Sequence, residues 1–186
     1  MSYAIPVDEL SIARMERFRK EAKEAALERA RDLKLATEMK ELVFREAFPG
    51  TDFGIGATGY TNETYITGAA AVANVWTSVF DTALVPQLGN NKIAVFYKIT
   101  NEDPAPATSA VRFRLGATGA TALGWFQIEQ FINIKLTPEV YLSEPIIYNP
   151  SQWLFIEFYP RAVVPAAGER LGFGCFIAEP VGEQLS

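Results

Sequence analysis

The chain changes character abruptly in the segment FPGTDFG, residues 48–54. From Val7 to Phe48 it contains neither glycine nor proline, and about half of these residues are charged. After residue 54, glycine and proline recur at short intervals, and aromatic and β-branched residues dominate. Glycine and proline disfavour helix interiors, whereas aromatic and β-branched residues favour strands. The segment therefore predicts a long helix followed by an all-β domain.

The predicted helix has one apolar face. Asp8 is expected to cap it, and Pro49–Gly50 is expected to end it. A helix of about 40 residues is about 60 Å long, whereas a body of about 138 residues is about 35–40 Å across. The helix therefore cannot lie wholly against its own domain unless it is bent or broken. Its apolar residues recur at close to 3.6-residue intervals and include Met15, Phe18, Ala22, Ala26, Ala30, Leu33, Met39 and Val43.

Two interpretations of this apolar stripe are open. The stripe is either the thin buried face of a surface helix that breaks near Asp32, or a surface that packs on other chains. Alanine buries little area but allows another backbone to approach closely. We expect the second arrangement, in which the stripe residues contact other chains.

The rest of the chain reads as strands of an antiparallel β-sandwich. In KIAVFYKIT, alternation is expected to place Ile93, Val95, Tyr97 and Ile99 on one face. The segment WLFIEFY is apolar on both faces apart from Glu157 and is expected to be a central strand. About eight strands separated by turn sequences predict a mainly β fold of jelly-roll type. The strands are expected at residues 64–67, 72–80, 92–100, 110–116, 123–136, 140–148, 153–159 and 170–178. The chain is thereby divided into a helical arm (1–48), a glycine-rich connector (49–63) and a β-sandwich body (64–186).

Composition excludes several classes of function. The chain contains no histidine, which removes catalytic triads that use it and the commonest metal ligand. The net charge is −5, and the body carries its lysines and arginines singly, so no nucleic-acid surface is expected. No apolar run is long enough to span a membrane, and no export leader is recognised at the N-terminus. The single Cys175 alternates with core residues and is interpreted as a small buried hydrophobe.

The segment GIGATG, residues 54–59, matches the dinucleotide-binding pattern G-x-G-x-x-G. That pattern binds pyrophosphate only between a strand and the helix that follows it. Here a helix precedes the glycines and a strand-like segment follows them, so the order is inverted. We expect a connector that binds no nucleotide.

Carboxylates and aromatic residues are the remaining candidates for chemistry. A glycosidase pair is conceivable among Glu129, Glu144 and Glu157, but Glu157 is expected to pair with Arg112, Arg114 or Lys98 across the sheet. The cluster Asn101, Glu102 and Asp103 is interpreted as a solvated turn rather than a calcium site. A sugar-stacking platform is conceivable from Trp76, Trp125 and Trp153, although tryptophans on sandwich strands usually belong to the core. The triplet at Asn62 is interpreted as a chance glycosylation match.

The terminal segment DELSIARMERFRKEAKEAALERARDLKLATEMKELVFREAF, followed by a β body containing KIAVFYKIT and QWLFIEFYP, resembles virion structural proteins of tailed bacteriophages. The resemblance is to jelly-roll capsid cement (decoration) proteins or head-fibre bases, and it carries over no functional residues. It implies a non-enzymatic protein without cofactor or metal, assembled as a homo-oligomer, most simply a trimer, in the host cytoplasm. Its partners would be further copies and the major capsid protein at the capsid surface, with no nucleic acid and no membrane.

Two rival functions remain. A carbohydrate- or receptor-binding module requires exposed tryptophans. A carboxylate glycosidase requires two acidic groups that face one cleft.

Overall fold

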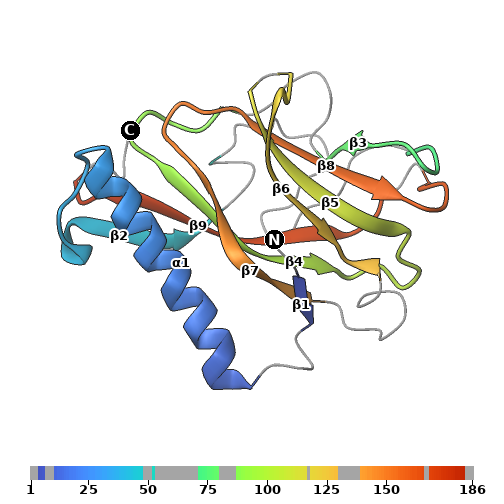
Figure 1. The fold of residues 1–186 in the computed structure, drawn as a ribbon, viewed down its shortest axis with the longest axis horizontal. Helices are drawn as coiled ribbons and strands as arrows, with labels where there is room; N and C mark the ends of the chain where they lie inside the picture. The colour runs from blue at the N-terminus through green and yellow to red at the C-terminus, as the bar shows by residue number, and fades with distance from the viewer. Residues whose placement is uncertain are drawn as a thin grey trace.

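The computed structural model describes residues 4–6, 11–47, 52, 71–79, 87–116, 118–129, 139–165 and 168–182. Within these residues the chain forms one α-helix, one short 3₁₀ turn and nine strands in two antiparallel sheets (Figure 1). The elements are β1 (Ala4–Pro6), α1 (Ile12–Asp32), the 3₁₀ turn (Met39–Glu41), β2 (Leu42–Glu46), β3 (Thr77–Ser78), β4 (Ile93–Asn101), β5 (Thr108–Leu115), β6 (Thr121–Gln127), β7 (Glu139–Tyr148), β8 (Leu154–Pro160) and β9 (Leu171–Pro180).

The pairing of the strands is nested. The five-stranded sheet has the order β1-β7-β4-β9-β2, and the four-stranded sheet has the order β3-β8-β5-β6. Strand β2 therefore pairs with β9, β3 with β8, β4 with β7, and β5 with β6. One long hairpin folded over on itself to give two sheets of four strands is a jelly roll, here with β1 added at one edge. The predicted fold class is confirmed.

Two apolar clusters hold the molecule together. The first lies between the sheets and includes Phe96, Phe113 and Phe158, all almost fully buried. The second lies between α1 and the outer face of the five-stranded sheet, where Tyr97 stacks on Phe176 with 4.8 Å between ring centroids. The helix is therefore a third layer on the sandwich.

The helix ends much earlier than predicted, at Asp32. Lys34 adopts a left-handed conformation with φ 58°, and its N–H donates to the carbonyl of Arg31. The N–H of Leu35 donates to the carbonyl of Ala30. These two bonds form a Schellman motif, which usually has glycine where this chain has Lys34. The break near Asp32 is thus the arrangement that the structure has, and the predicted 60 Å helix is wrong.

The segment after the break belongs to the β-sandwich. Leu42–Glu46 forms β2 and pairs with the last strand, β9. The division into a helical arm of residues 1–48 and a body that starts at residue 64 therefore does not hold, because β1 and β2 are strands of the five-stranded sheet. At its other end the helix begins at Ile12 and is capped by Ser11, whose Oγ accepts a bond from the N–H of Arg14, and not by Asp8.

A β-bulge changes the expected facing of β4. The register with both β7 and β9 shifts between Phe96 and Lys98. Ile93, Val95 and Tyr97 share one face as predicted, and this face packs against the helix, but Ile99 packs in the cluster between the sheets. A bulge inserts one residue and so reverses the alternation beyond it.

The other predicted strands correspond to observed ones, with shifted ends. Strand β8 is internal, between β3 and β5, as expected of WLFIEFY. The predicted strand 72–80 is reduced to β3 and an isolated bridge between Ala71 and Val164. The predicted strand 64–67, GIGATG, the Asn62 triplet and the part of strand 123–136 after residue 129 lie outside the described residues, as does most of the connector 49–63. Among the described helices, none is both long and apolar enough to cross a membrane.

Candidate ligand-binding face

The outer face of the four-stranded sheet is built by simple alternation. On β5, β6 and β8 the side chains of Val111, Phe126 and Ile156 point into the core between the sheets. Their neighbours must then point outward. Register places Arg112 opposite both Trp125 on β6 and Glu157 on β8, so these three side chains form one row across the sheet.

An ion pair lies at the centre of this row. Arg112 Nε and Nη2 donate to the two carboxylate oxygens of Glu157 at 2.6 and 3.0 Å. Arg114, two residues along β5, approaches the same carboxylate through Nη1 at 3.4 Å. A bidentate arginine–carboxylate pair fixes both partners, so the geometry of Arg112 is well defined. The predicted pairing of Glu157 with arginines across the sheet is confirmed.

Trp76 covers the Arg112 guanidinium. The Arg112 Cζ atom lies 4.2 Å from the Trp76 ring centroid, and Trp76 packs against Tyr159 at 5.2 Å between centroids. Asn74, with φ 62°, interrupts the edge of the sheet just before Trp76. This break explains why the strand predicted at residues 72–80 is short, and it leaves Trp76 on the outer face.

Trp125 is the most exposed aromatic side chain among the described residues, with 61% of its surface accessible. It lies beside a fixed guanidinium and not in the core, which corrects the expectation that sandwich tryptophans are buried. An exposed indole ring flanked by polar groups can stack on the apolar face of a ligand while the polar groups supply hydrogen bonds. The residues of this surface, called here the aromatic face, are Trp76, Arg112, Arg114, Trp125, Phe155, Glu157 and Tyr159.

The sequence predicts only part of the aromatic face. Trp76 and Trp125 were candidates, and the structure brings both to this surface. Trp153, the third, lies at the beginning of β8 and is 38% exposed. Arg114 was named only as a structural partner of Glu157. The alternation in AVRFRLG is the pattern from which its outward position could have been found.

The other candidate carboxylates do not join Glu157. Glu144 is exposed on β7, in the other sheet, and Glu129 forms an ion pair with Arg161. Since each lies in a separate setting, the structure does not assemble a glycosidase pair from these three residues. Glu169 is a further buried carboxylate, and it accepts bonds from Asn101 Nδ2, from the backbone N–H groups of residues 107 and 108, and from the Thr108 hydroxyl.

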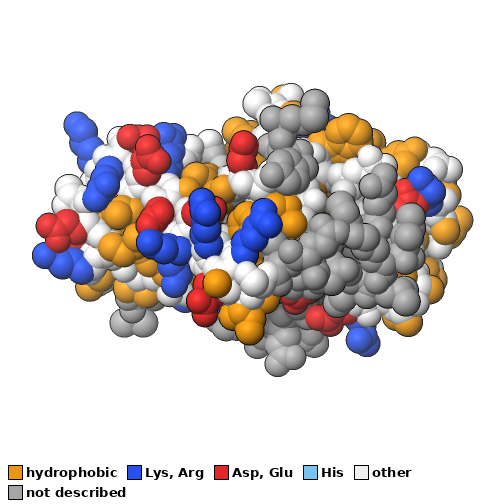
Figure 2. All heavy atoms as spheres, turned by 60° about the horizontal axis from the view of Figure 1, so that its bottom comes forward, with side chains coloured by type: hydrophobic (Ala, Val, Ile, Leu, Met, Phe, Trp, Pro, Cys, Tyr) orange, Lys and Arg blue, Asp and Glu red, His pale blue; other side chains and the backbone are white. Residues whose placement is uncertain are grey.

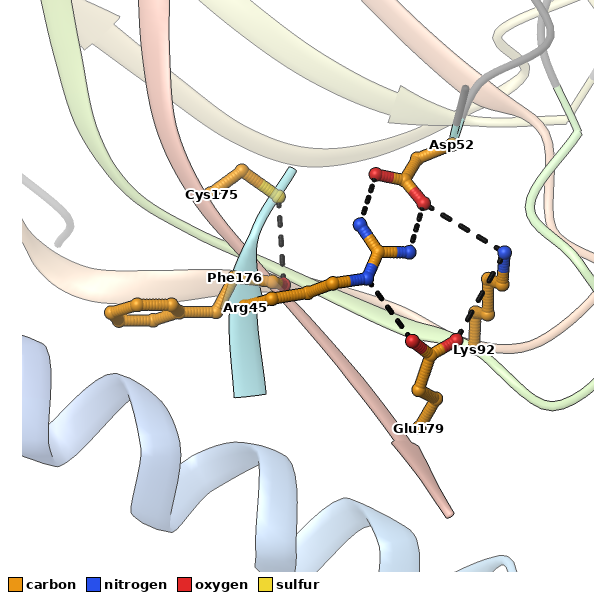
Figure 3. A network of polar contacts seen from close by, with 6 residues as sticks. All are labelled: Arg45, Asp52, Lys92, Cys175, Phe176 and Glu179. Atoms are coloured by element: carbon orange, nitrogen blue, oxygen red, sulfur yellow. Dashed lines mark hydrogen bonds and ion pairs between the residues drawn. The ribbon is translucent and has the colours of Figure 1, made fainter. Parts of the chain in front are cut away.

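A buried ionic cluster lies on the inner side of the five-stranded sheet at its β2 edge (Figure 3). Arg45 donates to both carboxylate oxygens of Asp52 and, through Nε, to Glu179 at 3.1 Å. Lys92 lies 3.7 Å from Asp52 and 3.9 Å from Glu179. The Asp52 carboxylate is fully buried, and its hydrogen bonds with Arg45 are the largest cause that raises the pKa of Arg45. The guanidinium therefore stays charged. With two cations and two anions the cluster is neutral, and it fixes the position of Asp52 on the sheet.

Most of the residues that were expected to contact other chains pack against other parts of this chain instead. Ala22, Ala26 and Ala30 are 0% exposed and pack on the five-stranded sheet. Met15, Phe18 and Leu33 are half-buried against the same cluster. Val43 is half-buried on β2, and Met39 is 37% exposed. The alanine stripe is therefore already covered, by the sheet of its own domain.

Two smaller predictions can be compared with the structure. Asn101 is the buried last residue of β4 and not part of a solvated turn, which corrects that interpretation, although its side chain accepts a bond from the N–H of Asp103 and Glu102 is exposed. Cys175 is buried, and burial raises the pKa of its thiol. In the described part of the chain, no three or more acidic or cysteine side chains are grouped so as to hold a metal ion.

Comparisons of the chain with protein-family models, with curated proteins and with solved structures find no match. Function is therefore inferred from the geometry of the chain itself.

Proposed function

We propose that the chain is a non-enzymatic structural protein of a virion, a capsid cement or head-fibre component. The observation that carries this proposal is the nested pairing of β2 to β9, since jelly rolls of this kind are common in viral capsid proteins. The support is at the level of fold, which hosts other functions too. The engagement of Glu157, Glu169 and Glu179 in hydrogen bonds or ion pairs agrees with a structural role for these carboxylates.

Subunit contacts in such a protein would use surfaces other than the alanine stripe. The bridge between Ala71 and Val164 sets Val72 opposite Val163, and both valines are about two-thirds exposed, at 66% and 68%. Val75 is a third exposed valine nearby in the chain. Exposed aliphatic side chains that adjoin one another favour a protein contact at this end of the four-stranded sheet. The partners proposed are further copies, most simply in a trimer, and the major capsid protein.

Charge supports the same proposal. At the left of Figure 2, on the side where Figure 1 has α1, basic and acidic side chains are intermixed. Much of this surface is neutralised by three ion pairs. Two lie within the helix, Arg17–Glu21 and Lys20–Glu24, and the third joins the helix to β2, Arg19–Glu46. Binding to nucleic acid needs clustered positive charge, so a protein partner fits this surface better.

Two measurements test the proposal. An antibody raised against the purified chain should label the surface of virions released from the source culture, as seen by immunogold electron microscopy. Light scattering of the purified chain should give a closed oligomer, and the double substitution Val72→Asp with Val163→Asp should reduce its mass. If the label stays with cells and never appears on virions, the virion proposal is wrong.

The aromatic face supports a second candidate, a carbohydrate-binding module. Trp125 is exposed beside the Arg112–Glu157 pair, and this arrangement offers a stacking platform bordered by hydrogen-bonding groups. Exposed tryptophans were the feature that this rival required. It is compatible with a location on a virion.

Tryptophan fluorescence tests the second candidate. Oligosaccharides that bind the aromatic face should change the emission and reduce acrylamide quenching of Trp125. Trp125→Ala should abolish this change in emission. Trp153→Ala, which alters the residue just before β8 begins, should leave the change in place. If no saccharide in a broad glycan array binds the wild-type protein, the carbohydrate candidate is overturned.

A further inference from the structure

The aromatic face carries more positive than negative charge. Its outward ionic residues are Arg112, Arg114 and Glu157, which give a local charge of +1 because two guanidinium groups share one carboxylate. The protein as a whole has a charge of −5. A locally positive surface on an acidic protein selects ligands by the sign of their charge.

Arg112 and Arg114 differ in the number of hydrogen bonds that their guanidinium groups donate within the protein. Arg112 is held by two bonds to Glu157 and lies beneath the Trp76 ring. Arg114 makes one long contact with Glu157, at 3.4 Å, and its Cζ lies 6.0 Å from the Phe155 ring centroid. Since a guanidinium has five N–H donors, Arg114 keeps most of its donors for a ligand.

Arg114 is also close to the exposed ring of the face. It lies two residues from Arg112 on the same strand, which is about 7 Å along β5, and Arg112 is directly opposite Trp125. A flexible arginine side chain spans such a distance. The Arg114 guanidinium is turned toward Glu157 on β8, on the other side of β5 from Trp125, and it reaches a ligand stacked on Trp125 when the side chain turns away from this long contact.

We propose that the ligand of the aromatic face is an acidic saccharide, a pyranose bearing a carboxylate. The sugar ring stacks on Trp125, and the carboxylate accepts a bidentate pair of bonds from Arg114. Planar guanidinium groups suit carboxylates in this way, and an ammonium does not. The inference rests on the carbohydrate candidate above and deepens it by naming the class of sugar and the residue that selects it.

Matched acidic and neutral sugars test the proposal. Tetragalacturonate and its methyl ester have the same ring skeleton and differ in charge, as do sialyllactose and its methyl ester. Titration calorimetry at low salt should show at least one acidic member binding about tenfold or more tightly than its neutral partner. The preference should shrink at 0.5 M salt, because salt screens an exposed ion pair.

Variants assign the preference to Arg114. Arg114→Gln should lower the affinity for the acidic sugar to that of its neutral partner. Arg114→Lys should retain only part of the preference for the acidic sugar. Arg14→Gln makes the same change in net charge on the exposed surface of α1, and it should leave the preference intact. Melting temperatures of all variants establish that each is folded.

The outcomes separate the two claims. If acidic and neutral partners bind equally and Trp125→Ala abolishes both, the carbohydrate candidate stands and the acidic-sugar inference is overturned. If Arg114→Gln keeps the full preference, Arg114 is not the selecting residue and the inference is also overturned. If no sugar of either kind binds, the carbohydrate candidate falls, and this inference falls with it.

Discussion

Gly174 on β9 occupies a place where no side chain fits. A Cβ atom added there would lie 2.8 Å from the Cβ of Lys98 and 2.9 Å from the Tyr97 ring. Both neighbours belong to the bulge of β4, which turns Tyr97 toward the helix and Ile99 toward the core. The glycine and the bulge therefore depend on each other.

Gly174→Ala is expected to destabilise the protein by about 1–3 kcal/mol, because the bulge must shift to make room for the methyl group. Urea denaturation measures the change. Gly89→Ala serves as a milder comparison, since its Cβ would meet the Lys92 side chain at 3.3 Å and no backbone atom of the bulge, so a smaller loss than at Gly174 is expected. Equal effects of the two substitutions would contradict the close contact at the bulge.

Three tyrosines make stability sensitive to alkaline pH. Burial is the main cause that raises the pKa of Tyr97, Tyr141 and Tyr148 above the usual value of 10. The Glu46 carboxylate, which accepts a bond from the Tyr97 hydroxyl at 3.1 Å, raises the pKa of Tyr97 further. Above pH 10 the unfolded chain releases phenolic protons that the folded chain keeps, so the stability is complete below pH 10 and is lost as the pH rises.

The melting temperature is accordingly expected to fall between pH 9 and pH 11. Tyr97→Phe removes one of the three phenols, so its melting temperature should fall less steeply than that of the wild type. Scanning calorimetry at closely spaced pH values measures both slopes. Identical slopes would show that Tyr97 does not contribute to the alkaline loss.

At the scale of elements, the small residues of α1 have a clear role. Ala22, Ala26 and Ala30 allow the helix backbone to approach the five-stranded sheet, while Arg19 and Lys23 extend over the Phe176 ring at 5.7 and 4.9 Å. Arg29 binds the side chain of Asn149 at 2.6 Å at the far end of the helix. The stripe therefore attaches the helix to its own sheet.

Ala26→Glu is expected to destabilise the protein by about 3–5 kcal/mol, because it buries a charge without a partner. Ala13→Glu, on the exposed first turn of the same helix, should change stability by no more than about 0.5 kcal/mol. Thermal denaturation compares the two. A variant at position 26 that keeps its stability but loses an oligomer would restore the interpretation of the stripe as a contact between chains.

The strands were more predictable from the sequence than the helix was. Alternating patterns located β4, β5 and β9, because each has one face in the core between the sheets, and an apolar run located the internal strand β8. The break near Asp32 was one of two interpretations and not the favoured one, because the Schellman motif that ends α1 uses Lys34 in place of glycine. Strand β2 was missed because LVFRE follows a charged segment without glycine or proline, so only its pairing with β9 identifies it. The aromatic face was partly predictable. The sequence identifies its tryptophans as candidates, but it does not show which of them are exposed.

At the scale of the whole molecule, the N-terminal quarter of the chain is part of the domain. It contributes two strands of the five-stranded sheet and the helix that covers that sheet. A chain without residues 1–48 therefore does not keep a complete five-stranded sheet. Such a chain lacks β2 and exposes the apolar outer face of the sheet.

Deleting residues 1–41, which spares β2, is expected to lower the melting temperature by about 10 °C, a loss of a few kcal/mol for a chain of this size. The uncovered cluster around Val95, Tyr97 and Phe176 should bind the dye ANS and favour aggregation. Dye fluorescence and light scattering measure these effects. A truncated chain that is monomeric, binds no dye and melts with the wild type would contradict the role of α1 as a covering layer.

The position of β9 in its sheet has a consequence for synthesis of the chain. This strand is the last of the nine described strands in chain order, yet it lies between β4 and β2, and it pairs with both. Until residues 171–180 emerge, β2 has no neighbour and β4 has one open edge. The jelly roll can therefore close only after residues 171–180 have been made, and until then its longest-range pairings stay unformed.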